Sequence, residues 1–303
     1  MRIFPIITLS LALLPQAMAA EAQSHPCPAP WVCEMNSVMT TSGITPSLRM
    51  GYYPEDQGQP FAGNVIYFEG LGDSMVNHAP LFQKLSQVGY RVIAFDYFGQ
   101  GGSEGSMNRT RIQGIIEIGA QVWSRYARVT LPRTRHTILG WSTGGLAAFV
   151  AAHQNATDRV ILIAPGLAPR VSVGSGILSL PPNQITLESL TSAQYSARNP
   201  NPHLEPISPQ SPLSVPLFSL NLMGTAKQMK GQSISPRIPV LAILSGKHDT
   251  YVNAAKTRAR LARAAPHREE IVFEFGKHEL DNESGEISDQ VSDSVIEFLN
   301  RTH

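Results

Sequence analysis

Short runs of almost only apolar residues recur along the chain, and longer segments separate them. The clearest runs are 64–68, 91–96, 159–164 and 239–244, and a shorter strand-like run lies at 136–139. Uninterrupted apolar runs of this length are typical of strands that are buried on both faces of a parallel sheet. A further run, 271–275, alternates instead and places Ile271, Phe273 and Phe275 on one side of a strand.

The segments between these runs predict helices, over 79–88, 111–128, 146–153, 254–264 and 286–299. In the last of them, Ile287, Val291, Val295 and Phe298 recur at helical spacing and form one apolar face. Strands that alternate with helices in this order predict an α/β fold with a mainly parallel, doubly wound sheet.

Two parts of the chain differ from this alternation. Residues 169–234 are rich in proline and poor in charge, and they are too long for a plain loop in a compact domain. We expect an inserted cap of short helices and turns there, between core segments 46–168 and 235–303. Residues 20–45 are rich in proline and serine and predict an arm over the surface. Two weak strands are expected to follow, near 37–41 and 47–53.

The first residues have the pattern of a secretory leader. Arg2 precedes an apolar run over 3–14, and Ala17-Met18-Ala19 supplies a small-x-small cleavage site. This predicts a signal peptide over 1–19, cut after Ala19 or Ala20, and a protein exported to the periplasm or secreted. No other run approaches the roughly 18 apolar residues of a membrane span.

Cysteine and charge usage narrow the picture further. The two cysteines, Cys27 and Cys33, are close together, and in an exported protein they predict one disulfide bond in the N-terminal arm. The chain has 24 basic and 23 acidic residues, and without Arg2 the two counts are equal. Because there is no basic cluster, we expect no nucleic acid partner. The sequence does not indicate an oligomeric state.

The stretch that organises the chain is Gly140-Trp141-Ser142-Thr143-Gly144-Gly145. A strand-like run leads into it and an alanine-rich helical run leads out. In that context Gly-x-Ser-x-Gly is a nucleophile elbow, in which a strained turn holds the serine hydroxyl above the sheet and the glycines let helix and strand approach. The alternative is an ordinary glycine-rich turn between strand and helix.

Two further side chains complete a Ser-His-Asp set. Acyl transfer by serine needs a base for the hydroxyl proton and a carboxylate to orient that base. Asp249 follows the run 239–244, and His278 follows the run 271–275. The strand ends of a parallel sheet meet at one edge, so Ser142, Asp249 and His278 are expected to lie together as nucleophile, acid and base.

Backbone amides are the expected donors to the oxyanion. Thr143 N–H follows the nucleophile at a helix start, and Leu71 N–H lies in the loop after the run 64–68. Glu69 stands two residues before Leu71, where an ionised carboxylate would oppose the oxyanion. We expect Glu69 to be protonated, or to turn away and accept hydrogen bonds from loop amides or from neighbours such as Asn77 or His78.

Two other motif-like stretches do not complete a cofactor or metal site. The loop Gly99–Gly105 is glycine-rich but has no phosphate-binding lysine. His278-Glu279 begins like a zinc-protease motif, but residue 282 is Asn where that motif has its second histidine. We therefore expect neither a cofactor nor a metal.

Together the motifs resemble the monoacylglycerol lipase and lysophospholipase-like branch of the α/β-hydrolase superfamily, which is grouped by sequence with serine aminopeptidases. The matching residues are 69–73, 89–92, Asp96, 99–105, 140–145, Asp249 and His278. The resemblance extends from about residue 45 to the end of the chain. It departs at Glu69, where that branch usually has histidine, and at Trp141, where histidine is frequent.

The resemblance and the apolar cap imply an exported serine hydrolase of small lipid esters, such as a monoacylglycerol or a lysophospholipid. The cap could also make transient contact with a lipid surface. Two alternatives stay open: a serine aminopeptidase-like peptidase, and a non-catalytic binder that keeps the fold.

Overall fold

The computed structural model describes residues 27–129, 134–170, 172–174, 177–179, 185–192, 201–207 and 215–301, and the predicted signal peptide lies outside them. One sheet is built from β1 (Val32–Asn36), β4 (Leu48–Tyr53), β5 (Gly63–Phe68), β6 (Tyr90–Phe95), β7 (Thr137–Trp141), β8 (Arg159–Ile163), β11 (Val240–Ser245) and β12 (Glu269–Phe273). Its eight strands have the order β1-β4-β6-β5-β7-β8-β11-β12.

The sheet is mainly parallel, as predicted. Every neighbouring pair from β6 to β12 is parallel, whereas β4 is antiparallel to both β1 and β6. The register aligns Phe68, Gly140, Leu162 and Ala242 in one row across β5, β7, β8 and β11. The segments that follow these strands therefore leave the sheet at the same edge, which is where ligands bind in open α/β sheets.

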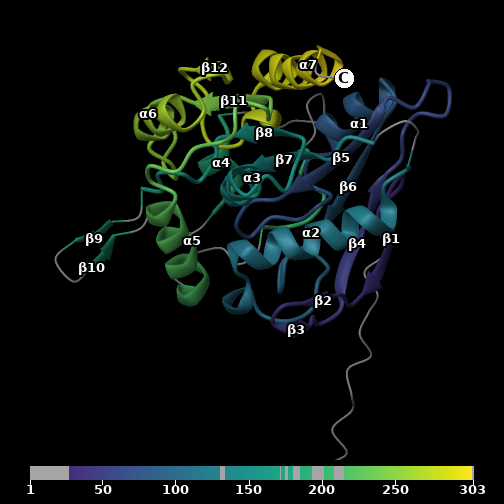
Figure 1. Cartoon of the computed structure of the whole chain (residues 1–303), viewed down its shortest axis with the longest axis horizontal. Helices are drawn as coiled ribbons and strands as arrows, with labels where there is room; N and C mark the ends of the chain where they lie inside the picture. The colour runs from purple at the N-terminus through teal and green to yellow at the C-terminus, as the bar shows by residue number, and fades with distance from the viewer. Residues whose placement is uncertain are drawn as a thin grey trace, which may run out of the picture.

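Helices cover both faces of the sheet (Figure 1). They are α1 (Ala79–Gln87), α2 (Ile112–Tyr126), α3 (Thr143–His153), α6 (Ala254–Ala264) and α7 (Gly285–Arg301). On β5, Ile66 and Phe68 pack in the core shared with α2, α3 and α6, whereas Val65 and Tyr67 pack in the core shared with α1 and α7. Apolar residues on both sides of one strand explain why these strands lack polar alternation.

The N-terminal arm contributes a strand to the sheet, which the sequence did not predict. β1 pairs with β4 from Val32↔Tyr52 to Asn36↔Leu48 and supplies partners for backbone groups of β4 that would otherwise form an open edge. The weak strand expected near 37–41 is reduced to β2 (Met39–Thr40), which pairs with β3 (Gly43–Ile44). The predicted disulfide between Cys27 and Cys33 is present and ties the start of the arm to β1.

The strand expected over 271–275 was placed two residues too late. β12 spans Glu269–Phe273, and Phe275 lies in the following turn with 73% of its surface exposed. The turn closes with a hydrogen bond from Gly276 N–H to the Phe273 carbonyl at 3.0 Å. This early exit from the edge strand brings His278 back over the sheet.

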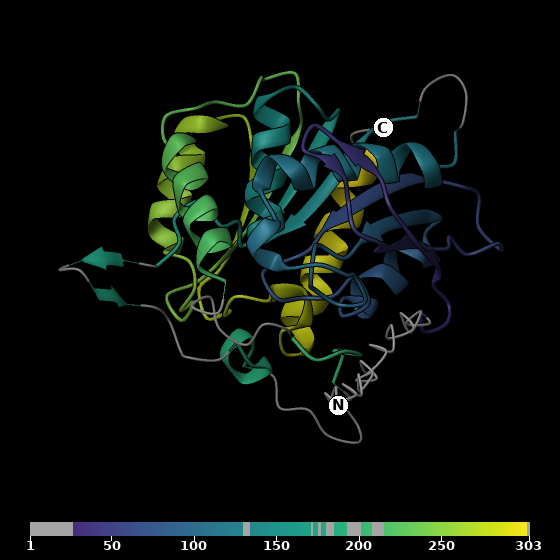
Figure 2. The same ribbon diagram turned by 90° about the horizontal axis from the view of Figure 1, so that it is seen from below.

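The segment predicted to be a cap contains both short helices and a β-hairpin. The helices are α4 (Leu187–Leu190) and α5 (Pro216–Gln228), and the hairpin of β9 (Ser172–Gly174) and β10 (Ile177–Ser179) projects from the molecule (Figure 2). α5 is anchored to the core because Asn221 Oδ1 accepts from Ile112 N–H at 2.9 Å. None of the helices in the described part of the chain has the length and apolar content of a membrane span.

Candidate active site

Ser142 occupies the strained turn between β7 and α3. Its backbone has φ 54° and ψ −112°, a conformation that non-glycine residues rarely adopt. The neighbouring glycines are required by space, since a Cβ on Gly140 would lie 2.3 Å from the Gly144 carbonyl oxygen. A Cβ on Gly144 would lie 1.9 Å from the carbonyl oxygen of Phe68. The close approach of strand, turn and helix fits the predicted elbow.

The structure brings together the three side chains that the sequence singled out. His278 Nε2 lies 2.7 Å from Ser142 Oγ, and His278 Nδ1 lies 2.8 Å from Asp249 Oδ2. The three residues follow β7, β11 and β12, so the parallel sheet places them at one edge. The result is an unbroken chain of hydrogen bonds from serine through histidine to aspartate.

Asp249 is held as a buried, ionised acceptor. Burial alone would raise its pKa, but His278, the Ser245 hydroxyl and backbone donors together lower the pKa below the ordinary value. Its Oδ1 accepts from Tyr251 N–H and Val252 N–H, both at 2.8 Å. Because an ionised carboxylate can only accept, His278 Nδ1 must carry a proton, which leaves Nε2 free to accept from Ser142.

Trp141 supports the loop that carries His278. Its Nε1–H donates to the His278 carbonyl oxygen at 2.9 Å, and its ring lies 5.5 Å from the imidazole, centroid to centroid. The indole also packs on Gly70, where a Cβ would come within 2.3 Å of it. Trp141, the residue before Ser142, therefore contacts both the His278 loop and the loop after β5.

The two expected oxyanion donors line the same cavity as Ser142. Thr143 is the first residue of α3, so its N–H has no intrahelical acceptor. Leu71 lies in the loop after β5, which is braced by Gln100. Gln100 Oε1 accepts from Gly72 N–H at 2.9 Å, and Gln100 Nε2 donates to the Gly70 carbonyl at 3.1 Å.

Glu69 is fully buried and turned toward the residues after β6. Its Oε1 accepts from Tyr97 N–H at 2.9 Å and from Gln100 Nε2 at 2.6 Å. Asn77 and His78 were the wrong candidates for its partners, because both bind Asp73 instead. Burial, with Asp96 and Asp73 nearby, raises the pKa of Glu69 well above its ordinary value, which favours the protonated form.

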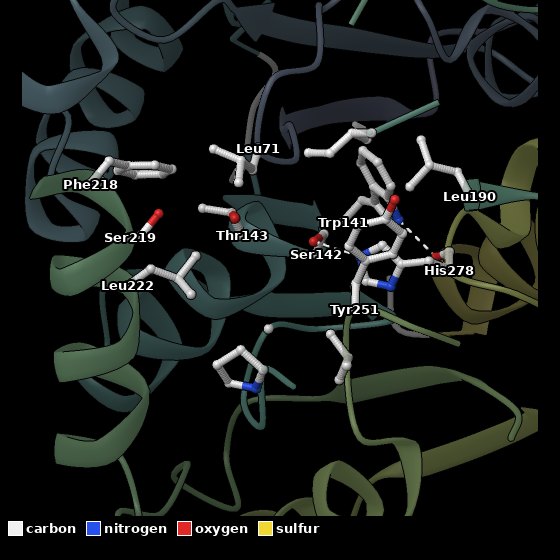
Figure 3. Close-up of a pocket in the computed structure, with 14 residues that line it drawn as sticks. Leu71, Trp141, Ser142, Thr143, Leu190, Phe218, Ser219, Leu222, Tyr251 and His278 are labelled. Atoms are coloured by element: carbon white, nitrogen blue, oxygen red, sulfur yellow. Dashed lines mark hydrogen bonds between the residues drawn. The ribbon is translucent and has the colours of Figure 1, made fainter. Parts of the chain in front are cut away.

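A mostly apolar cavity opens beside Ser142 (Figure 3). Its wall includes residues from the segment predicted to be the cap, namely Ile185, Leu190, Phe218, Ser219 and Leu222. Among the described residues that line it, only Tyr251 and His278 have titratable side chains. In the part of the chain that the structure describes, no group of three or more His, Cys, Asp or Glu residues could hold a metal ion.

The sequence interpretation missed a buried ionic cluster beside this site. His78 contacts Asp73 and Asp281, and Arg49 pairs with Asp96 and with Glu205. Apart from Asp73 and His78, these partners come from distant parts of the sequence, so spacing does not reveal them. The one local signal is His78 itself, which follows Asp73 closely and directly precedes a helix.

The parallel sheet, the elbow and the Ser-His-Asp arrangement define an α/β-hydrolase. Residues 59–285 match the family model described as "Serine aminopeptidase, S33", and the chain belongs to this family. Comparison with curated proteins gave no match.

Solved structures with the same fold include lipases and an esterase. A soluble variant of a monoglyceride lipase from Saccharomyces cerevisiae, with a substrate analogue, has a TM-score of 0.69 at 15% identity, covering 93% of this chain and 98% of that one. The monoacylglycerol lipase of Paleococcus ferrophilus has a TM-score of 0.61 at 19% identity, covering 84% and 99%. A carboxyl esterase from Bacillus coagulans, with glycerol, has a TM-score of 0.61 at 16% identity, covering 89% and 99%.

Proposed function

We propose that the protein is a serine hydrolase of carboxylic esters and acts through an acyl-enzyme. The observation that carries this proposal is the hydrogen-bonded chain Ser142–His278–Asp249 at the wall of an apolar cavity. Ser142 Oγ attacks the ester carbonyl and passes its proton to His278 Nε2, while the N–H groups of Leu71 and Thr143 hold the oxyanion. His278 then protonates the leaving alcohol, and water hydrolyses the acyl-enzyme by the same steps.

The cavity favours small lipid esters, such as a monoacylglycerol or a lysophospholipid. Leu71, Phe218 and Leu222 offer an apolar wall to an acyl chain. A peptidase that releases N-terminal residues needs a carboxylate for the substrate ammonium, and none occurs among the described residues that line the cavity. Leu217 and Leu220 are more than half exposed on α5 and would suit transient contact with a lipid surface.

The test is a substrate panel on purified protein with Ser142→Ala as its control. We expect hydrolysis of p-nitrophenyl butyrate and of a monoacylglycerol or lysophospholipid, but not of an aminoacyl p-nitroanilide. A fluorophosphonate probe should add its mass to Ser142, and Ser142→Ala should lose turnover while its melting temperature stays near that of the wild type. Preferential cleavage of the anilide would favour the peptidase, and a protein that is neither labelled nor active would be a binder.

Ser103 is the matched control for the nucleophile. It also lies in a glycine-rich loop, but its hydroxyl donates to the Asp96 carbonyl at 2.8 Å and accepts from Arg49 N–H at 2.9 Å. Both hydrogen bonds join the Ser103 hydroxyl to backbone groups, so its role is structural. Probe mass on Ser103 instead of Ser142 would reject the assignment.

We also propose that the protein is exported, to the periplasm or the medium. The leader-like sequence of residues 1–19 and the Cys27–Cys33 disulfide support this, because disulfides persist in oxidising compartments. N-terminal sequencing of the mature protein should start at Ala20 or Glu21. Retention of Met1 with two free thiols would contradict export.

A further inference from the structure

His78 lies between two carboxylates in the protein interior. It directly precedes α1, and its side chain is fully buried. The ring contacts Asp281 Oδ2 through Nδ1, and its Nε2 lies 2.7 Å from Asp73 Oδ2. A carboxylate oxygen at each ring nitrogen favours the doubly protonated imidazolium, in which both nitrogens donate.

The electrostatics of the cluster agree with this assignment. Burial by itself would lower the pKa of His78, but Asp281 and Asp73 outweigh burial and hold the pKa well above its ordinary value. Glu279 Oε1 also lies 4.0 Å from His78 Nε2 and 2.7 Å from Nε2 of His203. The ring therefore faces three carboxylates, one more histidine and the apolar rings packed around it.

The two carboxylates belong to different functional loops. Asp73 ends the loop 69–73, which carries the proposed oxyanion donor Leu71. Asp281 lies in the short helix η3 (Leu280–Asn282), three residues after His278. One imidazolium thus joins the loop that holds the oxyanion donor to the loop that holds the base.

The bridge also touches the element that carries the nucleophile. The His78 ring lies 5.2 Å from the Trp141 ring, centroid to centroid, and Trp141 immediately precedes Ser142. A second link runs parallel to it, since Asn282 Nδ2 donates to the Asn77 carbonyl oxygen at 3.0 Å. The loop with Leu71, the loop with His278 and the turn with Ser142 are therefore all linked to the His78 ring.

We propose that His78 is a positioning residue for ester hydrolysis. Its ring, hydrogen-bonded at both nitrogens, sets the spacing between the Leu71 N–H and His278 around Ser142. The proposal rests on the proposed function. Without the ring, Asp73 and Asp281 would face each other as buried like charges, and the two loops would separate. Misplacement of catalytic groups by about 1 Å can lower turnover roughly 100-fold.

The test compares His78→Gln, Asp281→Asn and the double variant with the wild type, using p-nitrophenyl butyrate. We count active sites by fluorophosphonate labelling and work well below each melting temperature. We expect kcat per labelled site to fall roughly 10- to 100-fold in each single variant, with KM within about twofold. The double variant should lose little more than a single one, because both substitutions break one bridge.

A control and a second readout separate positioning from stability. His136→Gln removes a half-buried histidine directly before β7, at the end of that strand opposite to Trp141, and should leave kcat per labelled site unchanged. In the wild type, ¹⁵N NMR should show both His78 ring nitrogens protonated at pH 8. Unchanged kcat in folded His78→Gln or Asp281→Asn, or a neutral His78 ring at pH 8, would overturn the proposal. A wild type that neither labels nor turns over ester would instead reject the proposed function.

Discussion

The backbone N–H of His278 donates a hydrogen bond to the carbonyl oxygen of Leu190 at 2.9 Å. The same carbonyl accepts from Glu279 N–H at 3.0 Å. Leu190 ends α4, in the segment inserted between β8 and β11, and its side chain lines the cavity beside Ser142. The wall of the cavity beside Ser142 and the loop of the proposed base are thus joined through the backbone. How firmly this region is held bears on the variants below.

Asp249→Asn tests which carboxylate orients His278. Glu279 and Asp281 are nearer in sequence, but Asp249 is the carboxylate that bonds His278 Nδ1. An amide at this position can present an N–H to Nδ1 and so favour the wrong tautomer. We expect kcat to fall by about 10³- to 10⁴-fold, with little change in KM.

Glu279→Gln is the matched control. The Glu279 carboxylate accepts from Asn282 Nδ2 at 2.6 Å and lies 2.7 Å from His203 Nε2, so it serves the cluster and not His278 directly. Its kcat should stay within about tenfold of the wild type. Equal losses in both variants would leave the acid unassigned.

Glu69→Gln should keep most activity and should change how stability depends on pH. A carboxyl group whose folded-state pKa is raised stabilises the fold below its unfolded pKa, and that contribution is lost as pH rises through the folded pKa. Glutamine keeps an acceptor for Tyr97 N–H and has no proton to lose. The melting temperature of Glu69→Gln relative to wild type should therefore increase from pH 5 to pH 9.

Glu69→Ala removes the acceptor altogether. Tyr97 N–H and Gln100 Nε2 then lose a buried partner, at about 1–3 kcal/mol for each unsatisfied donor. Thermal and urea unfolding at pH 7 should show the loss clearly. If Glu69→Gln abolished turnover at an unchanged melting temperature, Glu69 would take part in the chemistry and its role as a brace would be wrong.

The periodic parts of the chain could be read from sequence because local pattern determines them. The helix over 254–264 has the predicted bounds, and Ser142, Asp249 and His278 meet because parallel strands end at one edge. The β1 pairing could not be read, because an antiparallel edge partner is chosen by long-range packing. Phe275 was placed in a strand because its alternation fits, but the edge position of β12 lets the chain turn away after Phe273.

The ionic cluster beside the site could not be predicted from local sequence pattern either. Asp73 and Asp281 are separated by most of the chain, and each alone resembles a surface acid. Their pairing with His78 exists only after α1 and η3 are packed together beside the sheet. A motif-based interpretation finds the proposed triad and misses the buried cluster that lies beside it.

Trp141→Phe tests the link between the elbow and the His278 loop. Phenylalanine keeps an aromatic ring against Gly70 and His78 but removes the donor to the His278 carbonyl. We expect a loss of about 1–3 kcal/mol in the free energy of unfolding and a lower kcat with KM nearly unchanged. Trp123→Phe on α2 is the control, and an equal fall in kcat there would show that the effect is not specific to this bond.

Glu283 joins Ser192, just after α4, to Lys277 in the His278 loop. Its buried carboxylate accepts from Ser192 N–H and Ser192 Oγ–H, both at 2.6 Å, and from Lys277 N–H at 2.9 Å. In Glu283→Gln the amide group would face at least one of these donors with a donor of its own. Since charged hydrogen bonds of this kind contribute about 1.5–3 kcal/mol each, the segment should loosen.

Loosening should act first on substrate binding, because Leu190 lies just before Ser192 and lines the cavity. We expect KM for an acyl ester to rise about three- to tenfold and kcat to fall less than KM rises. Glu286→Gln, an exposed glutamate at the start of α7, should change neither constant. A fall in kcat at constant KM would contradict this prediction. It would mean that Glu283 positions the His278 loop and has no effect on the cavity wall.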